Sequence, residues 1–162
     1  MLKKRHFVSI FFVLLFWISM SGKVTAQTFS YVLQTSTLTF DYTSSSNFTS
    51  TRVIPKAFVL SINNSNRGRY NIYCKIVPIN SLSTIIDPST FFSVKFNSAN
   101  FSMSSSYQQT FNIGINDQLI GTATGRSKKS DTINYDLILN PLDLSNPPNI
   151  YNYTIAITVS EY

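Results

Sequence analysis

The sequence predicts an all-β protein built as an antiparallel β-sandwich of about 7–9 short strands. Two observations support this fold class. Apolar and polar residues alternate along several short runs, and turn-forming residues separate these runs at roughly the 8–12-residue interval expected of a sandwich. The composition also fits, since 43% of the residues are hydrophobic and 14% aromatic while only 12% are charged. We found no segment with a convincing helical period.

The clearest alternation lies in the last run of the chain, Tyr151–Tyr162. Its inward-facing residues are expected to be Tyr153, Ile155, Ile157 and Val159, which make this segment a candidate closing strand of the sandwich. A second alternating run, with Tyr135, Leu137 and Leu139, precedes it. The Asn- and Pro-rich residues 140–149 connect the two runs. The chain therefore ends on a strand that needs a partner.

The N-terminal segment has the pattern of a cleaved signal peptide. Three cations (Lys3–Arg5) precede the apolar run Phe7–Met20, and Val24–Ala26 supplies a cleavage-like site. An uncleaved membrane anchor is the alternative, but the apolar run is shorter than the roughly 18 residues that span a bilayer. We expect residues 1–26 to be removed. Residues 27–162 then form a single exported domain without a membrane span, located in the periplasm, at the cell surface or outside the cell.

Cleavage would change which side chains the mature chain contains. It removes the only histidine, His6, the only tryptophan, Trp17, and four of the thirteen cationic residues, which lowers the net charge from +6 to about +2. A chain without histidine cannot form a Ser-His-Asp triad or a histidine zinc site. Most of the seven acidic residues stand in turn contexts. We therefore expect no enzyme activity, no cofactor or metal, and no nucleic-acid binding.

The single cysteine, Cys74, cannot form a disulfide within the chain. It lies in the run 70–77, where Ile72, Cys74 and Ile76 share one face. We expect it to be a small buried hydrophobic residue, and an intermolecular disulfide is the alternative.

The remaining strands are expected in the following order. Residues 29–33 form the first, and residues 38–42 continue it with the opposite parity after a bulge or break. Residues 57–62 and 70–77 are expected to form a hairpin through the Asn-rich residues 63–69. Later strands are expected at residues 91–96, 107–113, 119–124 and from about residue 132 to 139, with residues 112–117 forming the turn between the second and third of these.

Arg126, Lys128 and Lys129 form a small basic cluster in a connecting loop. We interpret it as a solvated hairpin tip, and contact with anionic polysaccharide is the alternative.

Two segments carry a resemblance to a known group. The first is residues 57–64 (AFVLSINN) near the front. The second is the end of the chain, with residues 135–139 (YDLIL), a Pro-rich turn and residues 153–160 (YTIAITVS). Together they resemble the spore coat U and chaperone–usher pilin group. The resemblance implies an Ig-like sandwich whose subunits lend one another an N-terminal strand. It departs from pilins at Asn149 and Glu161, where pilins tend to have Gly and Tyr.

The resemblance makes Phe29, Tyr31 and Leu33 candidate donor-strand residues, which would pair with another chain. An ordinary first strand of the same domain is the alternative for this segment.

Two functions follow as expectations. The first is an exported, non-enzymatic structural or adhesive subunit, pilin-like or coat-like, that associates with itself or with another exported subunit through strand edges. The alternative is a secreted carbohydrate- or protein-binding module that acts as a monomer and stacks sugars on loop tyrosines such as Tyr107 and Tyr151.

Overall fold

The computed structural model describes residues 29–34, 46, 49–64, 67–78, 88–126, 129–141 and 153–162. The predicted signal peptide, residues 1–26, and the predicted strand at residues 38–42 lie outside the described residues.

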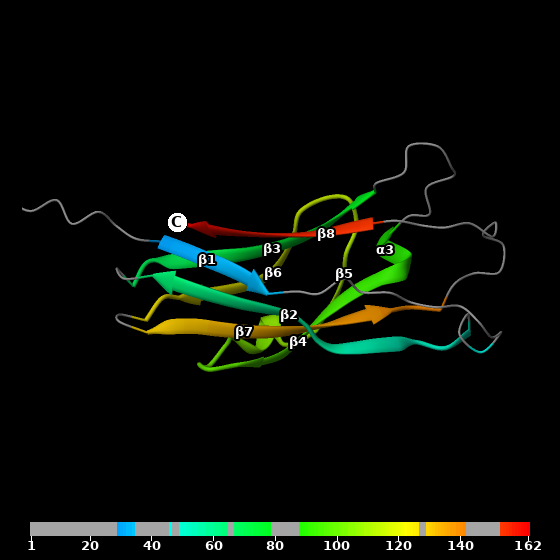
Figure 1. Cartoon of the computed structure of the whole chain (residues 1–162), viewed down its shortest axis with the longest axis horizontal. Helices are drawn as coiled ribbons and strands as arrows, with labels where there is room; N and C mark the ends of the chain where they lie inside the picture. Colours follow the sequence, from blue (N-terminus) through cyan, green and yellow to red (C-terminus); the bar gives the residue numbers. More distant parts are fainter. Residues whose placement is uncertain are drawn as a thin grey trace, which may run out of the picture.

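The described chain is a two-layered β-sandwich, which confirms the predicted fold class (Figure 1). Its eight strands are β1 (Phe29–Gln34), β2 (Arg52–Asn64), β3 (Arg69–Pro78), β4 (Phe92–Ala99), β5 (Thr110–Asn112), β6 (Gln118–Thr124), β7 (Ser130–Leu139) and β8 (Tyr153–Glu161). A short helix, α3 (Pro88–Phe91), precedes β4, and a single 3-10 turn, η1 (Ser105–Tyr107), lies between β4 and β5. One sheet has the strand order β1-β2-β7-β4-β5 and the other has the order β6-β3-β8, and all pairs are antiparallel.

The predicted hairpin between residues 57–62 and 70–77 was wrong. β2 pairs with β1 and β7, whereas β3 pairs with β6 and β8, so these two strands lie in different sheets. The physical reason is that turn-forming residues also suit a connection between two sheets. In that arrangement Leu60 of β2 and Ile72 of β3 are both fully buried, from opposite sides of the core. The Asn-rich connection therefore crosses from one layer to the other.

Three other expectations need correction. The strand expected at residues 107–113 is only Thr110–Asn112, because residues 105–107 form the 3-10 turn η1. Residues 112–117 do not form a hairpin turn, since β5 and β6 belong to different sheets. Residue 91 belongs to α3, not to the following strand.

β2 is longer than predicted because a bulge interrupts its alternation. The pairing register with β7 shifts between Ile54 and Phe58, and Lys56 has a φ of 50°. The backbone N–H of Lys56 donates a 2.8 Å hydrogen bond to Asp136 Oδ1, which satisfies the donor that the bulge removes from the ladder. Because the bulge breaks the alternation of apolar and polar residues, the first half of β2 could not be recognised as part of the strand from its sequence pattern.

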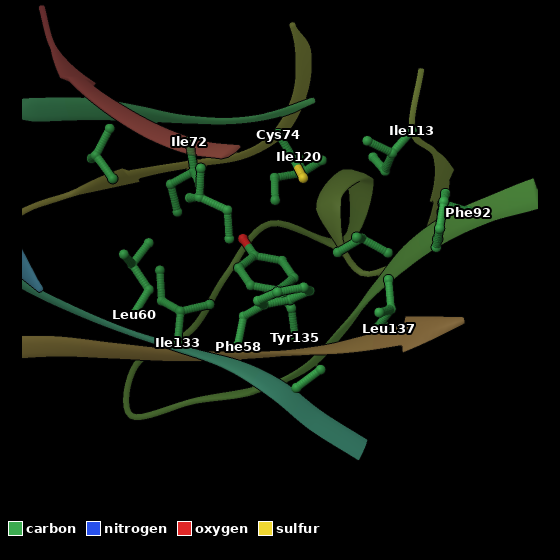
Figure 2. Close-up of a cluster of buried hydrophobic side chains, with 14 of the residues drawn as sticks. Phe58, Leu60, Ile72, Cys74, Phe92, Ile113, Ile120, Ile133, Tyr135 and Leu137 are labelled. Atoms are coloured by element: carbon green, nitrogen blue, oxygen red, sulfur yellow. The ribbon is translucent and has the colours of Figure 1, made fainter. Parts of the chain in front are cut away.

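The core lies between the two sheets (Figure 2). The expected inward row of β3, Ile72, Cys74 and Ile76, is at most 1% exposed, which confirms that Cys74 is a buried, free thiol. From the facing sheet, Tyr135 of β7 directs its hydroxyl group toward β3. The core thus contains one thiol, Cys74, and two phenols, Tyr70 and Tyr135, all shielded from solvent.

Candidate functional site

The candidate closing strand, β8, is an edge strand of the three-stranded sheet. It pairs with β3 along its full length, from Tyr153 opposite Pro78 to Glu161 opposite Tyr70. The structure places the four predicted residues on the core side of β8. Ile157 and Val159 are 8% and 7% exposed, while Tyr153 and Ile155 are half-buried at the other end of the strand.

Aromatic packing holds the start of β8 against the other sheet. The Tyr153 ring meets the Phe92 ring of β4 edge to face, with 5.2 Å between the ring centroids. Edge-to-face pairs of this kind stabilise beyond the area that they bury.

The outer edge of β8 has no partner strand among the described residues. The N–H of Tyr162 donates a 3.0 Å hydrogen bond to the Arg69 carbonyl of β3. This bond shows which residues of β8 direct their backbone groups toward β3. Because these groups alternate along an antiparallel strand, residues such as Ile155 and Ile157 direct their N–H and C=O groups away from β3. Among the described residues, no strand pairs with the backbone donors and acceptors on this outer side of β8.

The predicted donor-strand residues lie in β1, which is an edge strand of the five-stranded sheet. Phe29, Tyr31 and Leu33 stand opposite Asn64, Ile62 and Leu60 of β2, so all three are on the core side. Phe29 and Leu33 are half-buried against the core, whereas Tyr31 is 40% exposed. None of the six residues of β1 is fully buried.

The structure brings the two predicted segments together. β1 and β8 contact each other and run in opposite directions, each at the margin of its own sheet (Figure 1). We call this margin, formed by β1 and β8, the β1/β8 edge. It carries the exposed apolar side chains of Tyr31 and of Val32, which is 55% exposed.

One end of the β1/β8 edge is closed by a hydrogen-bonded contact that the sequence did not predict. Asn64, which is 3% exposed, donates 3.0 Å and 3.1 Å hydrogen bonds to Glu161 Oε1 and to the Gly68 carbonyl. A Cβ on Gly68 would lie 2.1 Å from Glu161 Oε1, so a larger residue here would displace the Glu161 carboxylate from this position. This contact anchors the end of β8 to the end of β2 and to the residue that precedes β3.

The interpretation of Arg126 as part of a solvated hairpin tip was wrong. β6 and β7 lie in different sheets, so the connection between them is not a hairpin. Arg126 Nε donates to Asp131 Oδ1, and the side chain of Asp131 is 1% exposed. The guanidinium also donates to the Asn100 carbonyl at 3.0 Å and stacks over the Phe101 ring. Lys129 is exposed, and Lys128 lies outside the described residues.

Two buried tyrosines differ in their partners. The Tyr70 hydroxyl donates a 2.9 Å hydrogen bond to Asp131 Oδ2, and burial together with this bond raises the pKa of Tyr70. The Tyr135 hydroxyl is the one buried side-chain polar atom in the described part of the chain that has no hydrogen-bond partner. Burial raises the pKa of Tyr135 as well. Both hydroxyl groups are shielded from solvent, the Tyr70 hydroxyl with a hydrogen-bond partner and the Tyr135 hydroxyl without a described one.

Burial, reinforced by the negative charge of Asp117, raises the pKa of Cys74 from 9.0 to about 12. A thiol with this pKa is protonated at neutral pH and is a poor nucleophile.

Of the tyrosines proposed to stack on sugars, Tyr107 is half-buried, and its hydroxyl lies 3.3 Å from Thr122 Oγ1 of β6. Tyr151 lies outside the described residues. Within the described ranges, no group of three or more His, Cys, Asp or Glu side chains is placed to hold a metal ion. No helix in these ranges is long and apolar enough to cross a membrane.

Comparison of the chain with protein-family models, with curated proteins and with solved structures finds no match. The β1/β8 edge therefore has to be interpreted from its own geometry.

Proposed function

We propose that this protein is an exported, non-enzymatic structural or adhesive subunit that assembles through the β1/β8 edge. The observation that carries the proposal is the position of β8, whose outer edge has no partner among the described strands and lies beside a second edge strand, β1. Unpaired edges of this kind template the addition of a strand from another chain.

The strand order supports an Ig-like interpretation of the sandwich. An Ig-type sandwich has one sheet ordered A-B-E-D and another ordered C-F-G. The order β1-β2-β7-β4 matches A-B-E-D, and the pair β3-β8 matches C-F. On this assignment, the free edge of β8 is the position that strand G occupies in a complete Ig-type sandwich. A strand from another subunit would fill that position, as the resemblance to pilins implies.

β1 is the segment best suited to act as the donor. It is held by one neighbouring strand, β2, and none of its residues is fully buried, so its separation from the domain exposes no fully buried side chain of its own. Its alternating Phe29, Tyr31 and Leu33 would present apolar side chains to a second copy as they do to their own core. The partner on this proposal is another copy of the chain or a related exported subunit.

The test is the molar mass of the exported protein, measured by size-exclusion chromatography with light scattering over a range of concentrations and in the presence of a reductant. We expect oligomers that persist in reductant, because Cys74 is buried. N-terminal sequencing of the same material tests cleavage after Ala26.

Two variants locate the interface. Deletion of residues 29–34 should abolish the oligomers and leave a monomer whose circular dichroism still shows β-structure. Thr154→Glu places a charge at an exposed position of β8, which should weaken strand addition. Thr124→Glu, on β6 at the opposite edge of the same sheet, is the matched control and should leave assembly unchanged. A protein that stays monomeric at all concentrations, or that assembles equally well with Thr154→Glu, would contradict the proposal.

A further inference from the structure

The solvent-facing side of β3 carries a row of side chains that neither the core nor the β1/β8 edge uses. Arg69, Asn71 and Tyr73 alternate with fully buried residues of β3 and therefore point outward. Thr122 of β6 lies opposite Asn71, and Tyr107 of η1, whose ring packs against the core, reaches Thr122 with its hydroxyl group. We call these five residues the outward row, and we propose that the outward row binds an acidic oligosaccharide, a chain of sugars that carries carboxylates.

The outward row is pre-organised by hydrogen bonds. Thr122 Oγ1 lies 2.7 Å from Asn71 Oδ1, and Asn71 Nδ2 lies 3.2 Å from the Tyr73 hydroxyl oxygen. The Asn71 oxygen has no proton, so Thr122 donates its single proton to it, and the Tyr107 hydroxyl, 3.3 Å away, donates to Thr122. Tyr73 accepts from Asn71, which leaves the Tyr73 O–H free to donate to a ligand.

The surroundings of Tyr73 suit a sugar ring. The half-buried Tyr73 is flanked by Leu119 on β6 and by Thr158 on β8, which is exposed. A sugar has an apolar face of C–H groups and a rim of hydroxyls. The tyrosine ring and Leu119 can contact the apolar face, while the hydroxyls of Tyr73 and Thr158 can exchange hydrogen bonds with the rim.

The charges on this face favour an acidic ligand over a neutral one. Lys75 Nζ lies 3.2 Å from Asp117 Oδ1, so these two charges neutralise each other. Arg69, at the other end of the outward row, is exposed and forms no ion pair with a described residue. A guanidinium with free donors binds a carboxylate in a bidentate manner. Arg69 and Tyr73 are separated by about 13 Å along the strand, which suits an oligosaccharide rather than a single sugar.

The test is native gel electrophoresis of the purified protein in gels that contain either sodium polygalacturonate or the neutral polymer dextran. We expect the acidic polymer to retard the protein and dextran to leave its migration unchanged. Tyr73→Ala should weaken binding about tenfold, as expected for removal of a central aromatic contact. Tyr73→Phe, which keeps the ring and removes the free donor, should lose part of the affinity.

A charge-matched pair separates a site from general adsorption by a cationic protein. Arg69→Gln should weaken binding, whereas Arg67→Gln, which removes an exposed cation just outside β3, should not. Thermal unfolding of each variant checks that it is folded, and if Tyr73→Ala unfolds, Tyr73→Phe and the arginine pair carry the test. The proposal is overturned if the acidic polymer fails to retard the protein, if dextran retards it equally, or if the two arginine variants behave alike. It does not depend on assembly through the β1/β8 edge.

Discussion

Arg126 and Asp131 form an ion pair whose carboxylate is buried while part of the guanidinium remains open to solvent. The same carboxylate accepts a hydrogen bond from Tyr70 on the opposite sheet, and the same guanidinium donates to Asn100 in the segment after β4. The pair therefore connects both layers of the sandwich at one end, in a protein whose single cysteine leaves it without an internal disulfide.

Removal of the cation should be strongly destabilising. Arg126→Met leaves the Asp131 carboxylate buried without its counter-charge, and we expect the free energy of unfolding to fall by about 3 kcal/mol. Urea unfolding followed by circular dichroism measures the change. Lys129→Met is the matched control, because Lys129 is exposed and should change stability by no more than about 0.5 kcal/mol. Equal effects of the two substitutions would show that the buried pair contributes little.

The two buried tyrosines should respond in opposite ways to loss of the hydroxyl. Tyr70→Phe leaves an acceptor of the buried Asp131 unpaired and should destabilise by about 1–3 kcal/mol. Tyr135→Phe removes a hydroxyl that has no described partner and should be neutral or stabilising by about 1 kcal/mol. Parallel denaturant titrations of the two variants make the comparison. A substantial loss of stability in Tyr135→Phe would mean that its hydroxyl has a hydrogen-bond partner in solution.

Much of the fold could be predicted from the sequence because burial on one face of a strand imposes period-2 alternation. The alternating rows of β3, β7 and β8 were identified in this way, and the structure places each of them against the core. Strand pairing could not be predicted, because alternation says which side of a strand is inside and not which strand lies beside it. The expected hairpin at residues 63–69 failed for this reason: turn-forming residues also suit a connection between two sheets.

The candidate site was only partly predictable. The sequence identified the residues of β1 and β8, but their proximity depends on the order of strands in both sheets. The role of Asp131 could not be predicted, since nothing in a single sequence shows that Tyr70 and Arg126 converge on it. The outward row likewise could not be predicted from the sequence. Asn71 and Thr122 are 51 positions apart, and only the β3–β6 register makes them neighbours.

Cys74 should make stability depend on pH in the alkaline range. Its pKa is raised from 9.0 in the unfolded chain to about 12 in the fold, so between these values the folded state holds a proton that the unfolded state has released. Stability from this group is fully present below pH 9 and decreases as the pH rises toward 12, by at most about 1.4 kcal/mol per pH unit.

The corresponding measurement is the urea midpoint as a function of pH for the natural chain and for Cys74→Ala. The variant should be less stable at neutral pH because of the cavity, and its stability should fall less steeply above pH 9. Tyr70 and Tyr135 also have raised pKa values and contribute to the slope of both proteins, so the difference between the two curves is the quantity to compare. Parallel curves would argue against a buried, protonated thiol.

Glycine should be required at Gly125 and dispensable at Gly114. A Cβ on Gly125 would lie 2.6 Å from the Cβ of Asn64, a side chain that is 3% exposed and hydrogen-bonded to Glu161 and Gly68. Asn64 cannot yield without breaking these bonds, so Gly125→Ala should lower the free energy of unfolding by about 1–3 kcal/mol. A Cβ on Gly114 would meet only Ser89 Cβ, at 3.4 Å, and Gly114→Ala should be neutral within about 0.5 kcal/mol. Thermal unfolding of the two variants measures the difference, and equal midpoints would show that the contact between β2 and the end of β6 adjusts freely. Because the same contact anchors the end of β8, Gly125→Ala should also increase amide hydrogen exchange at Tyr162, whose N–H donates to the Arg69 carbonyl.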